Sequence, residues 1–165
     1  MKTTKLKLLA AIGLLTLTMV ATAAMDDKKE MMKDMKDAVG GASINLPVTQ
    51  LKYFDTKIFG SNKSVGTLKA ASSYGDLQHG QHGTFIKMPA GFVSDIHIHT
   101  GEYYAVVISG VGVNGLPESK DIPLPVGSYW SQKGGERHVT KCISPNECIF
   151  FISQSVKFDE IFDKK

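Results

Sequence analysis

Three histidines in two separate stretches of the chain have the types and spacing of a metal site. His97 and His99 are two residues apart in a segment, 91–103, whose composition is typical of a strand. Because side chains at positions i and i+2 of a strand point to the same face, the two imidazoles offer paired neutral nitrogen donors to a divalent metal. By itself this H-x-H pair is a weak signal.

A third imidazole is available from the segment 127–138. His138 opens a strand directly after a glycine-containing turn, so its ring is able to face the interior of the same barrel. Three protein ligands leave coordination positions open for water or substrate, which is typical of a reactive site and not of a structural one.

The elements that must position these rings are short strands. From residue 45 onward, apolar runs with period two are separated by Gly, Pro, Asn and Asp, and no long helical repeat occurs. This pattern predicts an all-β sandwich or barrel. The segment 156–162 is expected to add an edge strand or a short helix. The expected strands are 48–54, 64–71, 83–88, 93–97, 103–108, 128–131, 137–141 and 147–153.

The two histidine stretches resemble the two sequence motifs of the cupin superfamily. The first motif is matched by Gly91, His97, His99, Glu102 and Gly110. The second is matched by Gly127, Gly135 and His138, with Lys133 in place of a proline and Cys142 in place of an asparagine. The resemblance covers about residues 45–160 and looks most like ChrR-like cupins and an uncharacterised, DUF-type cupin group. It implies a double-stranded β-helix (a jelly-roll barrel), one divalent metal ion, and a homodimer paired through its sheets.

The fourth ligand of the implied site is open between three alternatives. The usual carboxylate of the motif lies seven residues before the closing glycine, and counting back from Gly110 reaches Tyr103, with Glu102 one residue earlier. On a regular strand Tyr103 faces inward and Glu102 outward. A bulge at 100–101 would rotate Glu102 inward. The ligand is therefore Glu102, or Tyr103 replaces it, or water does.

Apolar and aromatic residues beside the motifs are expected to form the pocket. We predict that the pocket is lined by Phe92, Val107, Tyr129 and Trp130. His79 and His82 lie in a Gln- and Gly-rich stretch and are expected to be solvated loop residues.

The N-terminus has the pattern of an export signal. Lys2, Lys5 and Lys7 precede an uncharged apolar run over 8–20, and small residues at 21–24 offer a cleavage site. The run of 13 residues is short for a membrane span, which needs roughly 20 residues. We therefore predict a signal peptide over 1–24, a charged, Met-rich linker over 25–44 and the cupin barrel over 45–165.

Charge and cysteine usage agree with an exported protein. Removal of three lysines and no acidic residues takes the net charge from +3 to 0, so the mature chain has no electrostatic reason to bind nucleic acid or an anionic membrane. Cys142 and Cys148 bracket a Ser-Pro-Asn turn, where a disulfide can form in an oxidising compartment. The predicted location is the periplasm or the cell exterior.

Two classes of function follow from the predicted site. One is a metal-dependent dioxygenase, isomerase or hydrolase that acts on a small oxygenated molecule. The other is a non-catalytic sensor or binding protein for a metal or small ligand, and a barrel that has lost its metal is a third reading. A three-histidine set suits Fe, Mn, Ni or Zn. The composition, with 42% hydrophobic and 21% charged residues, excludes a disordered chain.

Overall fold

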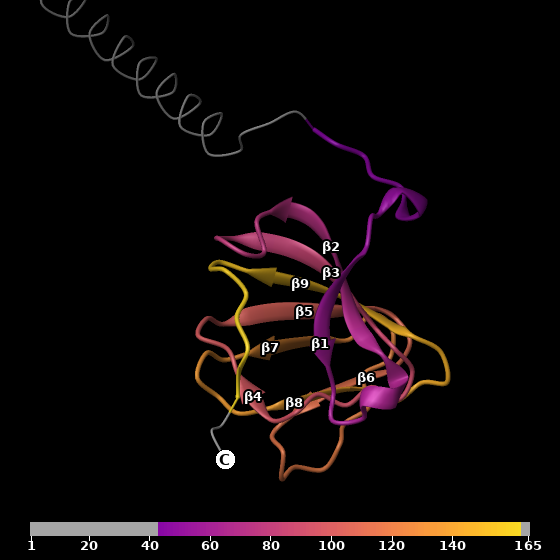
Figure 1. The fold of residues 1–165 in the computed structure, drawn as a ribbon, viewed down its shortest axis with the longest axis vertical. Coiled ribbons are helices and arrows are strands. Elements are labelled where there is room, and N and C mark those ends of the chain that lie inside the picture. The colour runs from indigo at the N-terminus through magenta and orange to yellow at the C-terminus, as the bar shows by residue number, and fades with distance from the viewer. Residues whose placement is uncertain (1–42, 163–165) are drawn as a thin grey trace, which may run out of the picture. The chain divides into compact units, whose positions relative to one another are not determined.

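The computed structural model describes residues 43–162, whose regular secondary structure consists almost entirely of strands (Figure 1). Within this range no helix is long and apolar enough to cross a membrane. The predicted signal peptide and most of the predicted linker lie outside the described residues. The two short 3-10 helices are η1 (Val48–Gln50) and η2 (Lys63–Val65). The strands are β1 (Phe54–Phe59), β2 (Thr67–Gly75), β3 (His82–Met88), β4 (His97–Ile98), β5 (Tyr103–Ser109), β6 (Gly112–Gly115), β7 (Tyr129–Gln132), β8 (Val139–Cys142), β9 (Cys148–Gln154) and β10 (Ile161–Phe162).

The strands form one large sheet and two small ones. The six-stranded sheet has the order β1-β2-β3-β9-β5-β7, and the pairs β6-β8 and β10-β4 form the two-stranded sheets. Figure 1 shows β4, β6 and β8 on the opposite side of the barrel from β2, β3 and β9. The pairings of these strands are all antiparallel, so the all-β prediction is confirmed.

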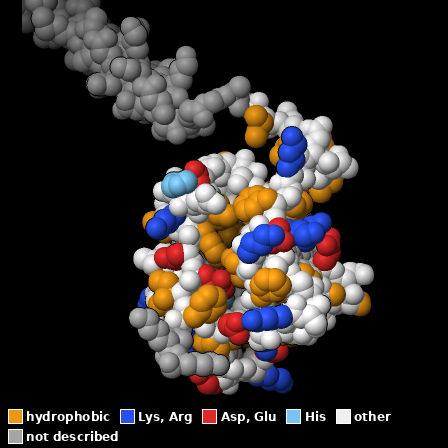
Figure 2. Space-filling view, viewed as in Figure 1, with side chains coloured by type: hydrophobic (Ala, Val, Ile, Leu, Met, Phe, Trp, Pro, Cys, Tyr) orange, Lys and Arg blue, Asp and Glu red, His pale blue; other side chains and the backbone are white. Residues whose placement is uncertain are grey.

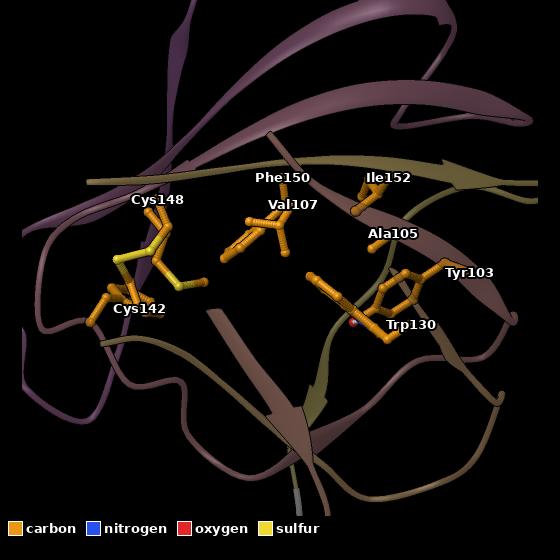
Figure 3. Close-up of a cluster of buried hydrophobic side chains, with 10 residues drawn as sticks. Tyr103, Ala105, Val107, Trp130, Cys142, Cys148, Phe150 and Ile152 are labelled. Carbon is orange, nitrogen blue, oxygen red and sulfur yellow. Dashed lines mark hydrogen bonds between the residues drawn. A yellow bond between two sulfur atoms is a disulfide. The ribbon is translucent and has the colours of Figure 1, made fainter. Parts of the chain in front are cut away.

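The core forms because alternate residues of each strand face inward. In β5, Tyr103, Ala105 and Val107 are buried, whereas Tyr104 and Ile108 are exposed. β9 pairs with β5 and has the same period-two pattern of burial. Figure 3 shows these inward side chains meeting those of β7 and β8. The buried cluster contains Met88, Phe92, Tyr103, Ala105, Val107, Trp130, Cys142, Cys148, Phe150 and Ile152.

Three elements differ from the sequence-based expectation. The expected strand over 48–54 begins only at Phe54, because 48–50 form the 3-10 helix η1. The strand then continues to Phe59 through its pairing with β2. The expected strand over 93–97 is reduced to one bridge at Val93 and the start of β4. β6 was not expected, because two glycines and an asparagine in four residues indicate a turn; its hydrogen bonds to β8 make it a strand.

The predicted disulfide between Cys142 and Cys148 is confirmed. Cys142 ends β8 and Cys148 begins β9, so the bond joins one of the small sheets to the large sheet. A disulfide is typical of an oxidising compartment.

Reduction of this disulfide is expected to lower the free energy of unfolding by about 2 kcal/mol, because a closed loop of this length restricts the unfolded chain. The two cysteines are six residues apart in sequence. The measurement is urea denaturation with and without a phosphine reductant. The double variant Cys142→Ala with Cys148→Ala is the control and should not respond to the reductant. Identical stability of the oxidised and reduced wild type would contradict the prediction.

Candidate metal centre

The structure brings His97, His99 and His138 together inside the barrel. One ligand nitrogen from each ring lies within 4.8 Å of the other two. The exposed fractions of the three residues are 5%, 3% and 1%. The centroid of the His97 ring lies 4.8 Å from that of the His99 ring and 4.2 Å from that of the His138 ring. The three imidazoles are therefore one buried group, formed from segments about 40 residues apart in the sequence.

Backbone pairing and two glycines place the rings. His97 and His138 are direct partners, with hydrogen bonds from each backbone N–H to the other carbonyl at 3.3 and 3.0 Å. The turn before His138 packs against the chain at His99: the N–H of Gly135 donates to the His99 carbonyl at 2.9 Å. A Cβ at Gly134 would lie 2.6 Å from the Thr100 carbonyl oxygen, and Gly135 has a φ of +75°. Only glycine fits both positions without strain.

Each of the three rings uses its Nδ1 to hold a backbone carbonyl. The acceptors are Asp95 for His97 at 2.8 Å, Asp159 for His99, and Glu136 for His138 at 3.2 Å. Because a carbonyl oxygen only accepts, each Nδ1 carries the hydrogen and each Nε2 keeps its lone pair.

The Nε2 lone pairs fit a divalent metal. The Nε2 of His138 is buried and has no hydrogen-bond partner among the described residues. A buried polar atom normally has a partner, so this nitrogen needs one that the protein does not supply. Histidines that bind a metal usually donate their other ring N–H to a carbonyl or carboxylate in this way, which fixes the orientation of the ring.

Burial keeps the three imidazoles neutral. It lowers the pKa of His97, and it lowers that of His99 to about 4. Burial, followed by the neighbouring His97 and His99, lowers the pKa of His138 to about 3. Because protons compete with metal for the same nitrogens, a triad that is neutral at pH 7 is ready to bind a cation.

The metal-free protein is expected to lose stability as the pH falls from 6.5 towards 4. The unfolded chain protonates these rings near the ordinary value of 6.5, whereas folded His99 and His138 do so only near pH 4 and pH 3, so the unfolded state binds more protons. The contribution of His99 alone is about 3 kcal/mol, fully present above pH 6.5.

The titration of Glu160 works against this loss of stability on acidification, but it involves only one proton. Burial raises its pKa from 4.5 to about 7, so its contribution is present below pH 4.5 and is lost as the pH rises to 7. Urea denaturation of chelator-treated protein at pH 7.5, 6.5, 5.5 and 4.5 measures the net effect. The variant His138→Asn should have a shallower pH dependence. Stability that stays level or rises on acidification would contradict the expectation.

The two candidates for a fourth ligand point in different directions where β5 begins. Glu102 is exposed, and its carboxylate accepts a hydrogen bond from the Tyr104 hydroxyl, so the structure does not bring it to the imidazoles. Tyr103 faces inward beside His99, with ring centroids 5.1 Å apart, and its hydroxyl accepts from the Trp130 Nε1–H at 3.3 Å. Burial raises the pKa of Tyr103 to about 12, so the hydroxyl is neutral at pH 7.

The pocket beside the triad is small and mostly apolar, with a volume of about 60 Å³. Two of the four predicted wall residues, Phe92 and Trp130, line it. Val107 does not; it is buried deeper in the core. Tyr129 is 57% exposed and stacks on Tyr104 outside the barrel, because alternation along β7 gives the inward position to Trp130. The lining residues are Leu68, Ile86, Met88, Phe92, Ser94, His97, His99, Tyr103, Trp130, Thr140, Phe150, Ile152, Phe158 and Glu160.

Two residues of the C-terminal segment 155–162, Phe158 and Glu160, line the pocket, although no site role was predicted for this segment. The expected edge strand is confirmed in part, since β10 pairs with β4. The alternation of Phe158, Glu160 and Phe162 is visible in the sequence, but it does not reveal the strand partner. His82 also differs from expectation: it is fully buried, with its ring nitrogens 3.0 Å from Thr84 Oγ1 and 3.2 Å from Gln154 Oε1.

The fold is that of solved cupin proteins. The polyketide cyclase RemF from Streptomyces resistomycificus is 14% identical, with a TM-score of 0.61 over 75% of this chain and 87% of that one. A sugar phosphate isomerase from a cupin superfamily, from Silicibacter pomeroyi DSS-3, is 12% identical, with a TM-score of 0.55 over 73% and 83%. A predicted oxalate decarboxylase from Thermotoga maritima is 17% identical, with a TM-score of 0.54 over 68% and 99%.

Sequence comparison places the chain in a family. No curated protein matches it. The family model described as "Domain of unknown function (DUF4437)" matches residues 60–163, which include all three histidines. The narrower likeness to ChrR-like cupins stays a prediction. The barrel therefore has the cupin fold, and the chain belongs to the family of unknown function DUF4437.

Proposed function

We propose that this protein is an exported metal-binding cupin that acts as a metal-dependent enzyme on a small oxygenated molecule. One observation carries the proposal: three buried imidazoles each have Nδ1 held by a backbone carbonyl, which leaves three Nε2 lone pairs for a cation. His97, His99 and His138 would hold it. A bound divalent metal supplies a Lewis acid there and activates water or an oxygen-bearing substrate.

The protein's own residues prepare the site. The backbone carbonyls of Asp95, Asp159 and Glu136 fix the orientation of the three rings. The Tyr103 hydroxyl accepts a hydrogen bond from the Trp130 indole N–H, and the Tyr103 ring lies edge-on beside His99. The apolar walls exclude bulk water, which strengthens the electrostatic interactions inside the pocket.

The size of the pocket and the relatives support a small substrate. A cavity of about 60 Å³ holds a few small groups, because one water molecule needs about 10–15 Å³. Solved relatives are named as a polyketide cyclase, a sugar phosphate isomerase and a predicted oxalate decarboxylase. We infer the same broad substrate class, small oxygenated molecules, for this chain. The fold alone does not determine the reaction.

Export completes the proposal. The disulfide supports an oxidising compartment, and we place the mature protein in the periplasm or outside the cell. Residues 1–24 would be removed as a signal peptide, which leaves a linker over 25–44 and the barrel over 45–165. N-terminal sequencing of protein secreted by a bacterial host tests this; a mature chain that begins at or close to residue 25 is expected. The homodimer implied by the cupin resemblance stays a prediction.

The enzymatic part is tested by turnover. Mature protein loaded separately with Fe, Mn, Ni or Zn is incubated with a panel of small diketones, thiols and sugar acids, while oxygen uptake and products are measured. Turnover by one metal form that is absent from the variant His97→Ala supports the enzyme. Tight binding of a panel compound without turnover favours the alternative, a metal or small-ligand binding protein. Turnover that is equal in wild type and His97→Ala would contradict the assignment of this site.

A further inference from the structure

We propose that Glu160 is a ligand-binding residue of the pocket, and that the ligand it takes is a neutral, hydroxyl-bearing molecule with an apolar body. Glu160 would accept a hydrogen bond from that hydroxyl. The inference refines the substrate class given above and rests on the proposed function for the location of the ligand. It concerns a side chain outside the two histidine motifs.

The C-terminal segment 155–162 carries Glu160 into the site. Figure 1 shows this segment running from the end of β9 across the barrel edge to β4. The Phe158 N–H donates to the Leu77 carbonyl at 2.8 Å, and the Asp159 carboxylate accepts from the Thr100 backbone N–H at 2.9 Å and from the Thr100 hydroxyl. Beyond Glu160, β10 pairs with β4. The segment is therefore fixed before and after Glu160, which directs this side chain and that of Phe158 into the pocket.

The Glu160 carboxyl group is mostly buried and receives no hydrogen bond from the described residues. Its side chain is 11% exposed, and the Nδ1 of the neutral His97 ring lies 3.7 Å from one of its oxygens. That Nδ1 already donates to the Asp95 carbonyl at 2.8 Å. No other residue in the described part of the chain donates a hydrogen bond to Glu160. The carboxyl oxygens therefore face the pocket with acceptor capacity that the protein leaves free, and a ligand hydroxyl could donate to them.

The position of Glu160 distinguishes it from the ligand nitrogens. It lies near the Nδ1 of His97, the side of that ring opposite to Nε2, and it is not part of the group of atoms within 4.8 Å of one another. We therefore propose that Glu160 contacts the bound small molecule and not the metal ion. With a divalent cation on the adjacent imidazoles, a cationic ligand group would be repelled, so a neutral hydroxyl is the favoured donor.

The rest of the ligand must be apolar. Beside the triad pocket lies a second cavity of about 180 Å³, and the two share Leu68, Ile86 and Phe158 as walls. Figure 2 shows apolar side chains gathered in a hollow on the face that carries β1 and the C-terminal segment. The hydroxyl end would lie at Glu160, and a ring or short alkyl group would pack against these shared walls. The second cavity is lined by Phe54, Thr56, Ile58, Leu68, Leu77, Gln78, Ile86 and Phe158.

The test compares two probes of the same shape, phenol and toluene, in the wild type and in Glu160→Leu. Calorimetry on the mature protein after metal removal gives the ratio of phenol affinity to toluene affinity for each protein. We expect the ratio to be about tenfold higher in the wild type, because phenol gains a hydrogen bond to the Glu160 carboxyl group that toluene cannot make. The conservative variant Glu160→Gln keeps an acceptor oxygen and should retain part of the preference.

Metal content and circular dichroism of the variant show whether Glu160→Leu affects the metal site or the fold. Elemental analysis should find the same metal content in Glu160→Leu as in the wild type, and this readout reports on the metal site independently of probe binding. Loss of metal in Glu160→Leu with retained circular dichroism would instead make Glu160 part of the metal site and overturn its assignment to the ligand. Equal affinity ratios in the two proteins, or no binding of either probe to the wild type, would also overturn the proposal.

Discussion

Replacing His138 by alanine is expected to lower the affinity for a divalent metal by more than about 100-fold. The substitution removes one of three nitrogens, and it removes the one whose Nε2 is buried without a hydrogen-bond partner in the described part of the chain. Changes to residues that merely orient a ligand cost about 10–100-fold in metal affinity, so loss of the ligand itself should cost more. Competition with a chromophoric chelator measures the affinity, and elemental analysis measures the metal bound after purification.

His79→Ala is the matched control. His79 is exposed, its ring pairs with Asp76 at 2.9 Å, and it does not line the pocket beside the triad. We expect this variant to bind metal like the wild type, so any non-specific effect of losing an imidazole is excluded. Retention of metal at wild-type stoichiometry and affinity by a correctly folded His138→Ala would rule out the three-histidine site.

Replacing Phe150 by alanine is expected to destabilise the fold by about 3–5 kcal/mol, the usual cost of truncating a buried phenylalanine. Phe150 is 2% exposed, and its ring meets Trp130 edge to face with centroids 5.2 Å apart. The ring also packs against β6, because a Cβ at Gly112 would lie 2.7 Å from its Cε1 atom. It therefore joins the large sheet to the β6-β8 pair. The loss is a large fraction of the stability of an ordinary domain, about 5–15 kcal/mol.

The neighbouring residue provides the control for this substitution. Phe151 lies on the same strand but on the other face, where it is half-buried against Phe85 with ring centroids 5.0 Å apart. We expect Phe151→Ala to cost about 1–2 kcal/mol. Urea denaturation of both variants at pH 7.5 and in the same metal state gives the two values. If the two variants lost similar free energy of unfolding, the assignment of Phe150 to the core face of β9 and of Phe151 to its outer face would be wrong.

Much of the histidine site could be read from sequence because its parts are local. The i, i+2 spacing of His97 and His99 places both rings on one side wherever the chain is extended, and the glycines before His138 indicate the turn that precedes it. The same local reasoning predicted the turn between Cys142 and Cys148. In β5, alternation correctly placed Tyr103 inward, and no bulge rotated Glu102 towards the imidazoles.

Other features were decided by contacts between distant segments. Trp130 and Tyr129 are equally good pocket residues by composition, and the register of β7 on β5 determines which one faces inward. β6 contains turn-forming residues and becomes a strand only through its pairing with β8. His82 looks like a loop residue until β3 pairs with β9 and brings Gln154 within hydrogen-bond distance of its ring.

Local sequence was enough to predict the period-two alternation, the two histidine motifs and the disulfide turn, because each depends on residues within a few positions of one another. The course of the C-terminal segment to β4, which brings Glu160 beside His97 and the Asp159 carbonyl to His99, depends on contacts between distant parts of the folded chain. These partners are about 60 residues apart in the chain. Their pairing depends on which strand edges remain free once the barrel has closed, and strand pairing of that kind is a property of the whole fold.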